Sequence, residues 1–133
     1  MKRVTGIGGI FFKAKDPKKM QAWYHKHLGL PMTPDGYIVF EWGNQAVPGY
    51  TVWSTFPEDT KYYEPSTKPF MINYRVENLD ALLALLKEEG VQVVGEPETH
   101  EYGKFAWIMD PEGNKIELWE PNDPVFKTIN KMD

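Results

Sequence analysis

The hydrophobic residues of this chain follow a helical period in some segments and a period of two in others, and the same succession of segments occurs twice. Residues 10–16 and 72–78 share one order of apolar, aromatic, basic and helix-capping residues. Apolar side chains at helical spacing then predict a helix between Asp16, a good N-cap, and Gly29, a left-handed C-terminal stop. A leucine stripe predicts the matching helix over residues 79–89. The pattern therefore predicts two equivalent strand–helix units.

Short segments rich in apolar and aromatic residues, separated by Gly- and Pro-containing turns, follow each helix and predict strands. These strands cover residues 36–42 and 50–56 in the first half, and 91–94, 104–109 and 115–120 in the second. We therefore expect one domain over residues 1–133, divided into a first βαβββ module (5–56), a connector (57–69), a second βαβββ module (70–121) and a tail (122–133).

The composition narrows the classes of function. With a formal net charge of −4 and interspersed acidic and basic residues, the chain lacks the basic stripe that nucleic-acid binding requires. Its lack of cysteine excludes disulfides and thiolate metal sites, and no apolar run is long enough to span a membrane. We expect a cytoplasmic protein that binds neither nucleic acid nor membrane. Aromatic residues make up 14% of the chain, and this excess needs a location.

Particular motifs accompany the repeat. They are the Asp-Pro that opens the first helix, the Trp23-Tyr24 pair within it, Leu28-Gly29-Leu30 after it, and the segment DPEGNKIELWE at residues 110–120. With these motifs the chain resembles the vicinal oxygen chelate superfamily, which includes glyoxalase I, bleomycin resistance proteins, fosfomycin resistance enzymes and extradiol dioxygenases. The resemblance covers about residues 5 to 121. It implies an α+β fold in which tandem βαβββ modules form a curled mixed sheet around a central cleft, and it leads us to expect a homodimer.

The resemblance also implies where a metal ion would be bound, at four symmetry-related positions on the first and last strand of each module. In this chain those positions are Gly9, Thr51, Met71 and Glu117. Only Glu117 is a competent ligand for a hard metal ion, whereas a divalent site needs three or more His, Asp or Glu donors. We therefore expect neither a metal nor another cofactor.

Strand alternation identifies the candidate site residues. If Ile116 and Leu118 pack on the helix side, Glu117 and Trp119 point into the cleft. Glu117 is the candidate catalytic or anchoring carboxylate, although hydrogen bonds from a neighbouring Trp, Tyr or Asn would give it a purely structural role. The candidate ligand-binding residues are Phe11, Thr51, Trp53, Met71, Asn73, Trp107 and Trp119. The sequence does not assign a face to Trp107, and the tryptophans could instead fill the core or a dimer interface.

Other residues give weaker signals. Two tyrosines in the connector could form a lid over the cleft or cover the edge of the sheet. His27 lies on the apolar face of its helix and favours a core or boundary position, and His100 lies in a polar segment that we expect to be a solvated loop.

Three functional hypotheses follow. The first is a glyoxalase-like or bleomycin-resistance-like protein that binds a small cationic or aromatic molecule in an aromatic cleft without a metal. The second is a lyase, isomerase or dioxygenase of the same superfamily that uses Glu117 as a general base or metal ligand. The third is a dimeric interaction module whose cleft is closed.

Overall fold

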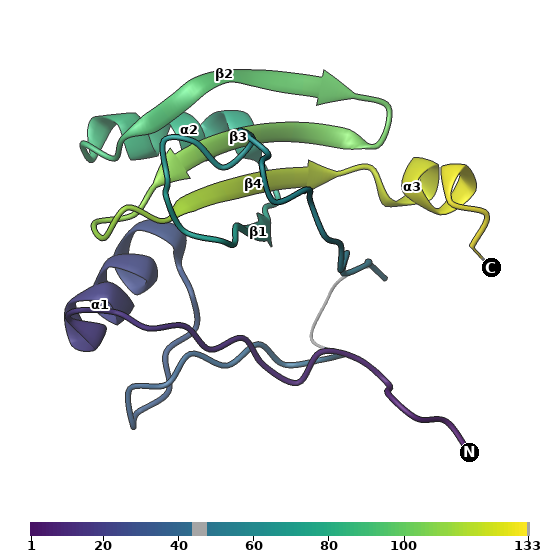
Figure 1. Ribbon diagram of the computed structural model, residues 1–133, viewed down its shortest axis with the longest axis horizontal. Coiled ribbons are helices and arrows are strands. Elements are labelled where there is room, and N and C mark those ends of the chain that lie inside the picture. Colours follow the sequence, from purple (N-terminus) through teal and green to yellow (C-terminus); the bar gives the residue numbers. More distant parts are fainter. Residues whose placement is uncertain (44–47, 133) are drawn as a thin grey trace.

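The computed structural model describes residues 1–43 and 48–132. Within them a four-stranded mixed sheet in the order β1-β4-β3-β2 packs against two helices (Figure 1). β1 runs parallel to β4, and β3 runs antiparallel to both β4 and β2. The elements in chain order are α1 (Pro17–Leu28), β1 (Ile72–Arg75), α2 (Leu79–Glu88), β2 (Val93–His100), β3 (Gly103–Met109), β4 (Lys115–Pro121) and α3 (Asp123–Ile129). The α+β class predicted from the sequence is confirmed.

Both predicted helices form, with the predicted caps. The Asp16 side chain accepts a hydrogen bond from the Lys19 amide at 3.1 Å, and Gly29 ends α1 in the left-handed region at φ 66°. Asn78 caps α2 through the amide of Ala81, also at 3.1 Å. The local signals were sufficient here because capping depends on residues only three positions apart.

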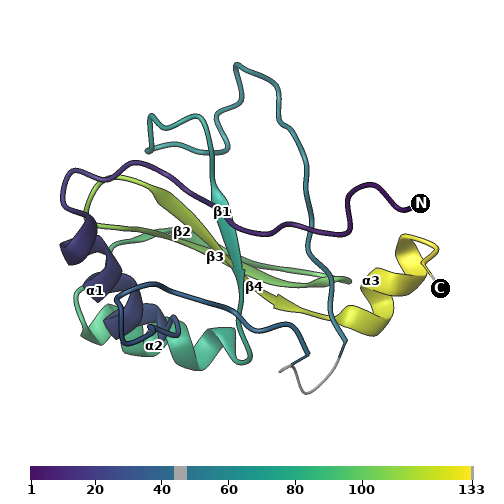
Figure 2. The same ribbon diagram turned by 90° about the horizontal axis from the view of Figure 1, so that it is seen from below.

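The core lies between the sheet and the two helices. Leu79, Leu83 and Leu86 of α2 are buried against alternate residues of β3 and β4, and α1 adds Met20 and Tyr24. Each buried leucine contributes about 1.5–3 kcal/mol through the removal of apolar surface from water. Figure 2 shows both helices on one side of the sheet and the connector on the other. The connector-facing side is therefore free to carry a site.

The hairpin between β3 and β4 fastens α1 to the sheet. Asp110 accepts four hydrogen bonds, from the amides of Glu112 and Asn114, from the Asn114 side chain and from the Tyr24 hydroxyl. Glu112 in turn accepts from the amides of Lys15 and Asp16 at 2.6 and 3.0 Å, and these two bonds hold its pKa below the usual value. The first residues of the motif at 110–120 thus have a structural role, which is to join α1 to the β3–β4 hairpin.

The first half differs from the prediction. Neither residues 36–42 nor residues 50–56 form a strand, and within the described residues of the first half the one β-pairing is an isolated bridge between Met32 and Ile38. Phe11 and Trp53, which were predicted to line the cleft, are instead exposed by 94% and 79%. A period of two marks a chain that suits a pleated surface, but a strand forms only where a neighbouring strand accepts its hydrogen bonds. In the described residues the sheet is built by the second half.

The second half differs in smaller ways. β2 is longer than predicted and reaches His100, after a register shift between Val94 and Glu98. His100 therefore ends a strand and does not belong to a loop, although its side chain is exposed as expected. The tail forms α3, which the sequence left open.

Candidate functional site

The candidate site lies on the sheet face turned away from α1 and α2. Along β4, Ile116 and Leu118 belong to the core beneath the helices, so Lys115, Glu117 and Trp119 point to the opposite face. This is the alternation that the sequence predicts. All three residues are buried, although neither α1 nor α2 covers this face.

Glu117 lies at the centre of this face and is held by its two neighbours in the sheet. The strand register pairs its Cα with that of Asn73 on β1 and that of Trp107 on β3. Asn73 Nδ2 donates to Glu117 Oε1 at 2.7 Å, and Trp107 Nε1 donates to Glu117 Oε2 at 2.9 Å. Because both donors are fixed by backbone pairing, the carboxylate has one defined position.

The third donor comes from the connector. The Tyr62 hydroxyl donates to Glu117 Oε2 at 2.5 Å, and its ring meets that of Trp107 edge to face at 6.0 Å. Burial raises the pKa of Tyr62 above its ordinary value, and the hydrogen bond to the Glu117 carboxylate raises it further. The phenol therefore stays protonated and remains a donor at neutral pH.

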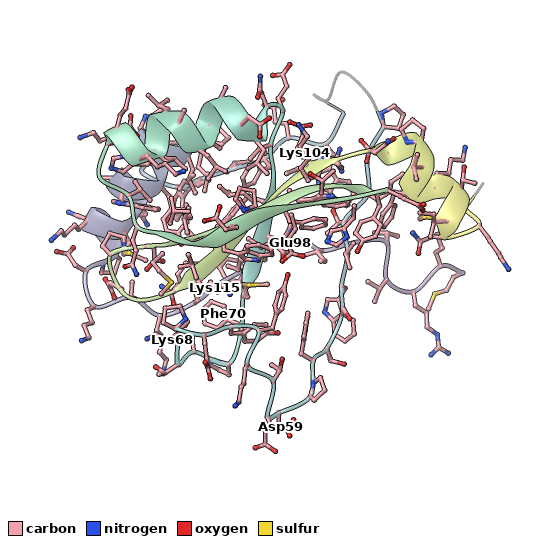
Figure 3. All side chains as sticks on the ribbon, turned by 90° about the horizontal axis from the view of Figure 1, so that it is seen from above. Asp59, Lys68, Phe70, Glu98, Lys104 and Lys115 are labelled. Carbon is pink, nitrogen blue, oxygen red and sulfur yellow. The ribbon has the colours of Figure 1, made fainter. Side chains whose placement is uncertain are left out.

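Lys115 lies beside the carboxylate. Its Nζ donates to the Tyr62 carbonyl oxygen at 2.6 Å and is 5.2 and 5.6 Å from the ring centres of Tyr62 and Trp107. Burial lowers the pKa of Lys115, and the nearby charges of Glu117 and Glu64 partly offset this effect. Figure 3 places Lys115 on the connector side of the sheet, with Asp59 at the far end of the connector.

A second group of aromatic rings continues the face toward α3. Trp119 stacks with Phe105 at 5.9 Å and carries the Arg75 guanidinium 5.6 Å above its ring. Arg75 also forms a two-pronged ion pair with Asp123, at 2.9 and 2.8 Å, and Phe126 packs on Trp119 at 5.5 Å. These contacts attach α3 to the sheet and leave Glu117 between two aromatic groups.

The structure brings together only some of the predicted site residues. Asn73 and Trp107 donate to Glu117, and Trp119 lies on the same face of β4, as the alternation predicts for Asn73 and Trp119. Met71 immediately precedes β1. Phe11, Thr51 and Trp53 belong to the first half and are exposed, and in the described residues no hydrogen bond or ring contact joins them to Glu117. Phe11, Thr51 and Trp53 would line the cleft only if the first half formed a module equivalent to the second.

Tyr62 and Lys115 were absent from the predicted set. Lys115 could have been found, because it lies two residues before Glu117 on the same face of the same strand. Tyr62 was considered only as part of a possible lid, and its contact with Glu117 depends on the path of a connector that no periodicity describes.

The residues around Glu117 do not fit the metal ion that the fold family uses at this position. Both carboxylate oxygens are already engaged by N–H and O–H donors, which suit an anion and cannot ligate a cation. The other three family positions hold Gly9, Thr51 and Met71, which lack strong donors. Within residues 1–43 and 48–132, moreover, no three His, Asp or Glu side chains form a group that could hold a metal.

Two hollows in the described surface lie away from Glu117. A cavity of about 220 Å³ lies between the end of α1, β1 and α2, where it is lined by Leu28, Tyr74 and Leu82. An open groove of about 870 Å³ lies between the β2–β3 hairpin and α3 and is lined by His100, Lys104 and Asp123. The space above Glu117 is filled by Tyr62.

Together, the βαβββ unit of the second half and the acidic, aromatic site on its open face define an α+β protein of the glyoxalase type. The chain belongs to the Glyoxalase/Bleomycin resistance protein/Dioxygenase superfamily, whose family model matches residues 6–118.

Solved structures support the fold. TnmS3, an antibiotic binding protein from Streptomyces sp. CB03234, is similar with a TM-score of 0.58 at 20% identity, over 92% of this chain and 100% of that one. A member of the same superfamily from Sphaerobacter thermophilus DSM 20745 gives a TM-score of 0.56 at 22% identity, over 88% and 98% of the two chains. A comparison with curated protein sequences gave no match. None of the helices in the described part of the chain has the length and apolar character needed to cross a bilayer.

Proposed function

We propose that this protein binds a small aromatic molecule on the sheet face that the connector covers, without a metal ion, and that Glu117 anchors it. The observation that carries the proposal is a buried carboxylate held between two groups of aromatic rings. Flat apolar walls with a few fixed polar groups are typical of small-molecule sites. The antibiotic binding protein with a similar fold agrees with this role.

The contacts favour an aromatic ligand over a cationic one. A cation would be attracted by Glu117 and the indole rings, but Lys115 already places its ammonium group over the rings of Tyr62 and Trp107. A second cation in the same place would be repelled, because both charges would lie in a poorly solvated environment. We therefore expect neutral aromatic molecules to bind more tightly than otherwise similar amines.

A binding screen with tryptophan fluorescence tests this function. We expect neutral polycyclic aromatic compounds to quench the emission and to raise the Tm, and expect Trp107→Leu to weaken binding by about tenfold or more, since a buried aromatic contact is lost. Trp23→Leu, on the helix side of the sheet, is the matched control and should leave affinity unchanged. A stoichiometric metal bound through Glu117, or a panel in which no compound binds, would contradict the proposal. Turnover that Glu117→Gln abolishes would instead indicate the lyase, isomerase or dioxygenase alternative.

We also propose that two copies of the chain associate through the first half. Large apolar side chains gather there on the surface, and Phe11, Trp42 and Trp53 are each exposed by more than 70%. Extended apolar surface of this kind marks an interface, because leaving it in water is costly. Light scattering should give twice the mass of the chain, and Trp53→Lys should shift the protein toward the monomer. A wild-type monomer at high concentration would rule this arrangement out.

A further inference from the structure

The three hydrogen-bond donors to Glu117 differ in how they are held. Asn73 and Trp107 stand on neighbouring strands in register with Glu117, so they cannot leave without breaking the sheet. Tyr62 belongs to a turn of the connector, outside every helix and strand. Its side chain is 39% exposed, whereas Trp107 and Glu117 are buried. Tyr62 is therefore the one exchangeable donor among the three.

Tyr62 is attached to the site at two points. Its hydroxyl donates to Glu117 and its carbonyl accepts from Lys115, two residues earlier on β4. Its ring lies edge to face with Trp107 and stacks on Phe56 at 5.5 Å. Moving the turn that carries Tyr62 away would free one acceptor position on the carboxylate, one ammonium donor and the ring contact with Trp107 at the same time.

These three groups describe the molecule that could take the place of Tyr62. It would need an aromatic ring against Trp107 and a hydroxyl on that ring for Glu117. An acceptor such as a carbonyl would meet the freed ammonium of Lys115. A ring without the hydroxyl would leave Glu117 Oε2 with Trp107 Nε1 alone as its donor among the described residues. The site therefore favours a phenol by one hydrogen bond to a charged group.

We propose that Tyr62 is a tethered occupant of the Glu117 site and that the ligand of this protein is a phenol, which binds by displacing Tyr62. The proposal rests on the proposed function and adds the class of ligand. Because the tethered phenol competes at every moment, it lowers the apparent affinity for any free phenol. The connector thus selects for ligands that bind better than its own tyrosine.

Calorimetric titration of the whole chain with two probes tests the proposal. The probes are 4-methylphenol and 4-methylanisole, which differ in whether the ring oxygen carries a proton. In Tyr62→Ala, 4-methylphenol should bind about tenfold or more tighter than to the wild type, a change the size of one hydrogen bond to a charged group. It should also bind about tenfold or more tighter than 4-methylanisole. Adding Glu117→Gln should reduce this preference, because a neutral amide is a weaker acceptor.

The matched control is Tyr63→Ala. It removes the adjacent connector tyrosine, which contacts Phe56 at 5.3 Å and makes no hydrogen bond to Glu117 in the described residues. Its affinity for 4-methylphenol should equal that of the wild type. An equal gain in Tyr63→Ala would mean that loosening the connector matters and the phenol of Tyr62 does not.

Two further outcomes separate the proposals. Equal binding of both probes to Tyr62→Ala would overturn the phenol assignment while leaving aromatic binding intact. Binding of neither probe to a folded Tyr62→Ala would overturn the displacement proposal. The proposed function would also fail if the polycyclic compounds of the fluorescence screen did not bind. If Tyr62→Ala is unfolded, Tyr62→Phe keeps the ring and removes only the donor, and the same preference for 4-methylphenol is required of it.

Discussion

Replacing Asp110 by alanine should destabilise the protein strongly without altering the ligand site. Asp110 is 6% exposed and accepts four hydrogen bonds. Of the two backbone donors, the Glu112 amide is only partly buried, so water recovers part of its loss, whereas the Asn114 backbone amide is buried. The Tyr24 hydroxyl and the Asn114 amide would stay buried without an acceptor. Together with the Asn114 backbone amide these are three buried donors without an acceptor, and at about 1–3 kcal/mol for each the expected loss of unfolding free energy is about 3 kcal/mol or more.

Urea denaturation of a double-mutant cycle measures this contribution. Tyr24→Phe alone should cost about 1–2 kcal/mol, because Asp110 keeps three of its donors. In the Asp110→Ala background the same substitution should cost almost nothing, since the partner is already absent. A loss below about 1 kcal/mol for Asp110→Ala, or additive losses in the double variant, would refute the conclusion that Asp110 joins α1 to the hairpin through Tyr24.

Three other outcomes follow from the structure. Burial raises the pKa of Tyr74 from 10.0 to about 12, so its contribution to stability is present below about pH 10 and is lost as the pH rises toward 12. Titrations of the tyrosinate absorbance of folded and urea-unfolded protein measure this shift, and the same pKa in both states would contradict it. Gly103 has φ +137°, and a Cβ there would collide with the backbone of β4. Gly103→Ala should therefore lower the unfolding free energy measured in urea by about 2–4 kcal/mol, and an unchanged value would disprove the close approach. Arg75→Met should loosen α3 by removing the ion pair with Asp123, so the rate of amide hydrogen exchange should rise in α3 alone. An unchanged rate would show that side-chain packing is enough to hold α3 on the sheet.

Much of the site could be predicted from the sequence, because it depends on one strand. The alternation in residues 115–119 placed Glu117 and Trp119 on one face and the core residues on the other. The helix caps and the β3–β4 hairpin could be predicted as well, because each depends on residues a few positions apart in the sequence. The resemblance supplied the superfamily, which the family model confirms over residues 6–118.

The first half shows where this reasoning ends. Its apolar and aromatic segments predict strands as those of the second half do, yet residues 36–42 and 50–56 form no strands in the structure. Phe11, Thr51 and Trp53, which were predicted to line the cleft, are consequently exposed. Strand formation depends on a partner strand, and a sequence pattern does not say which partner is present.

The sequence by itself determined the repeat, the helices with their ends, the superfamily and the face on which Glu117 lies, because each depends on residues close together in the chain or on a motif. Only the tertiary structure decided which side chains meet the carboxylate. Asn73 and Trp107 reach it through strand register, and Tyr62 reaches it through the path of a connector 55 residues away in sequence. Such contacts join distant segments, and they depend on how the whole chain packs.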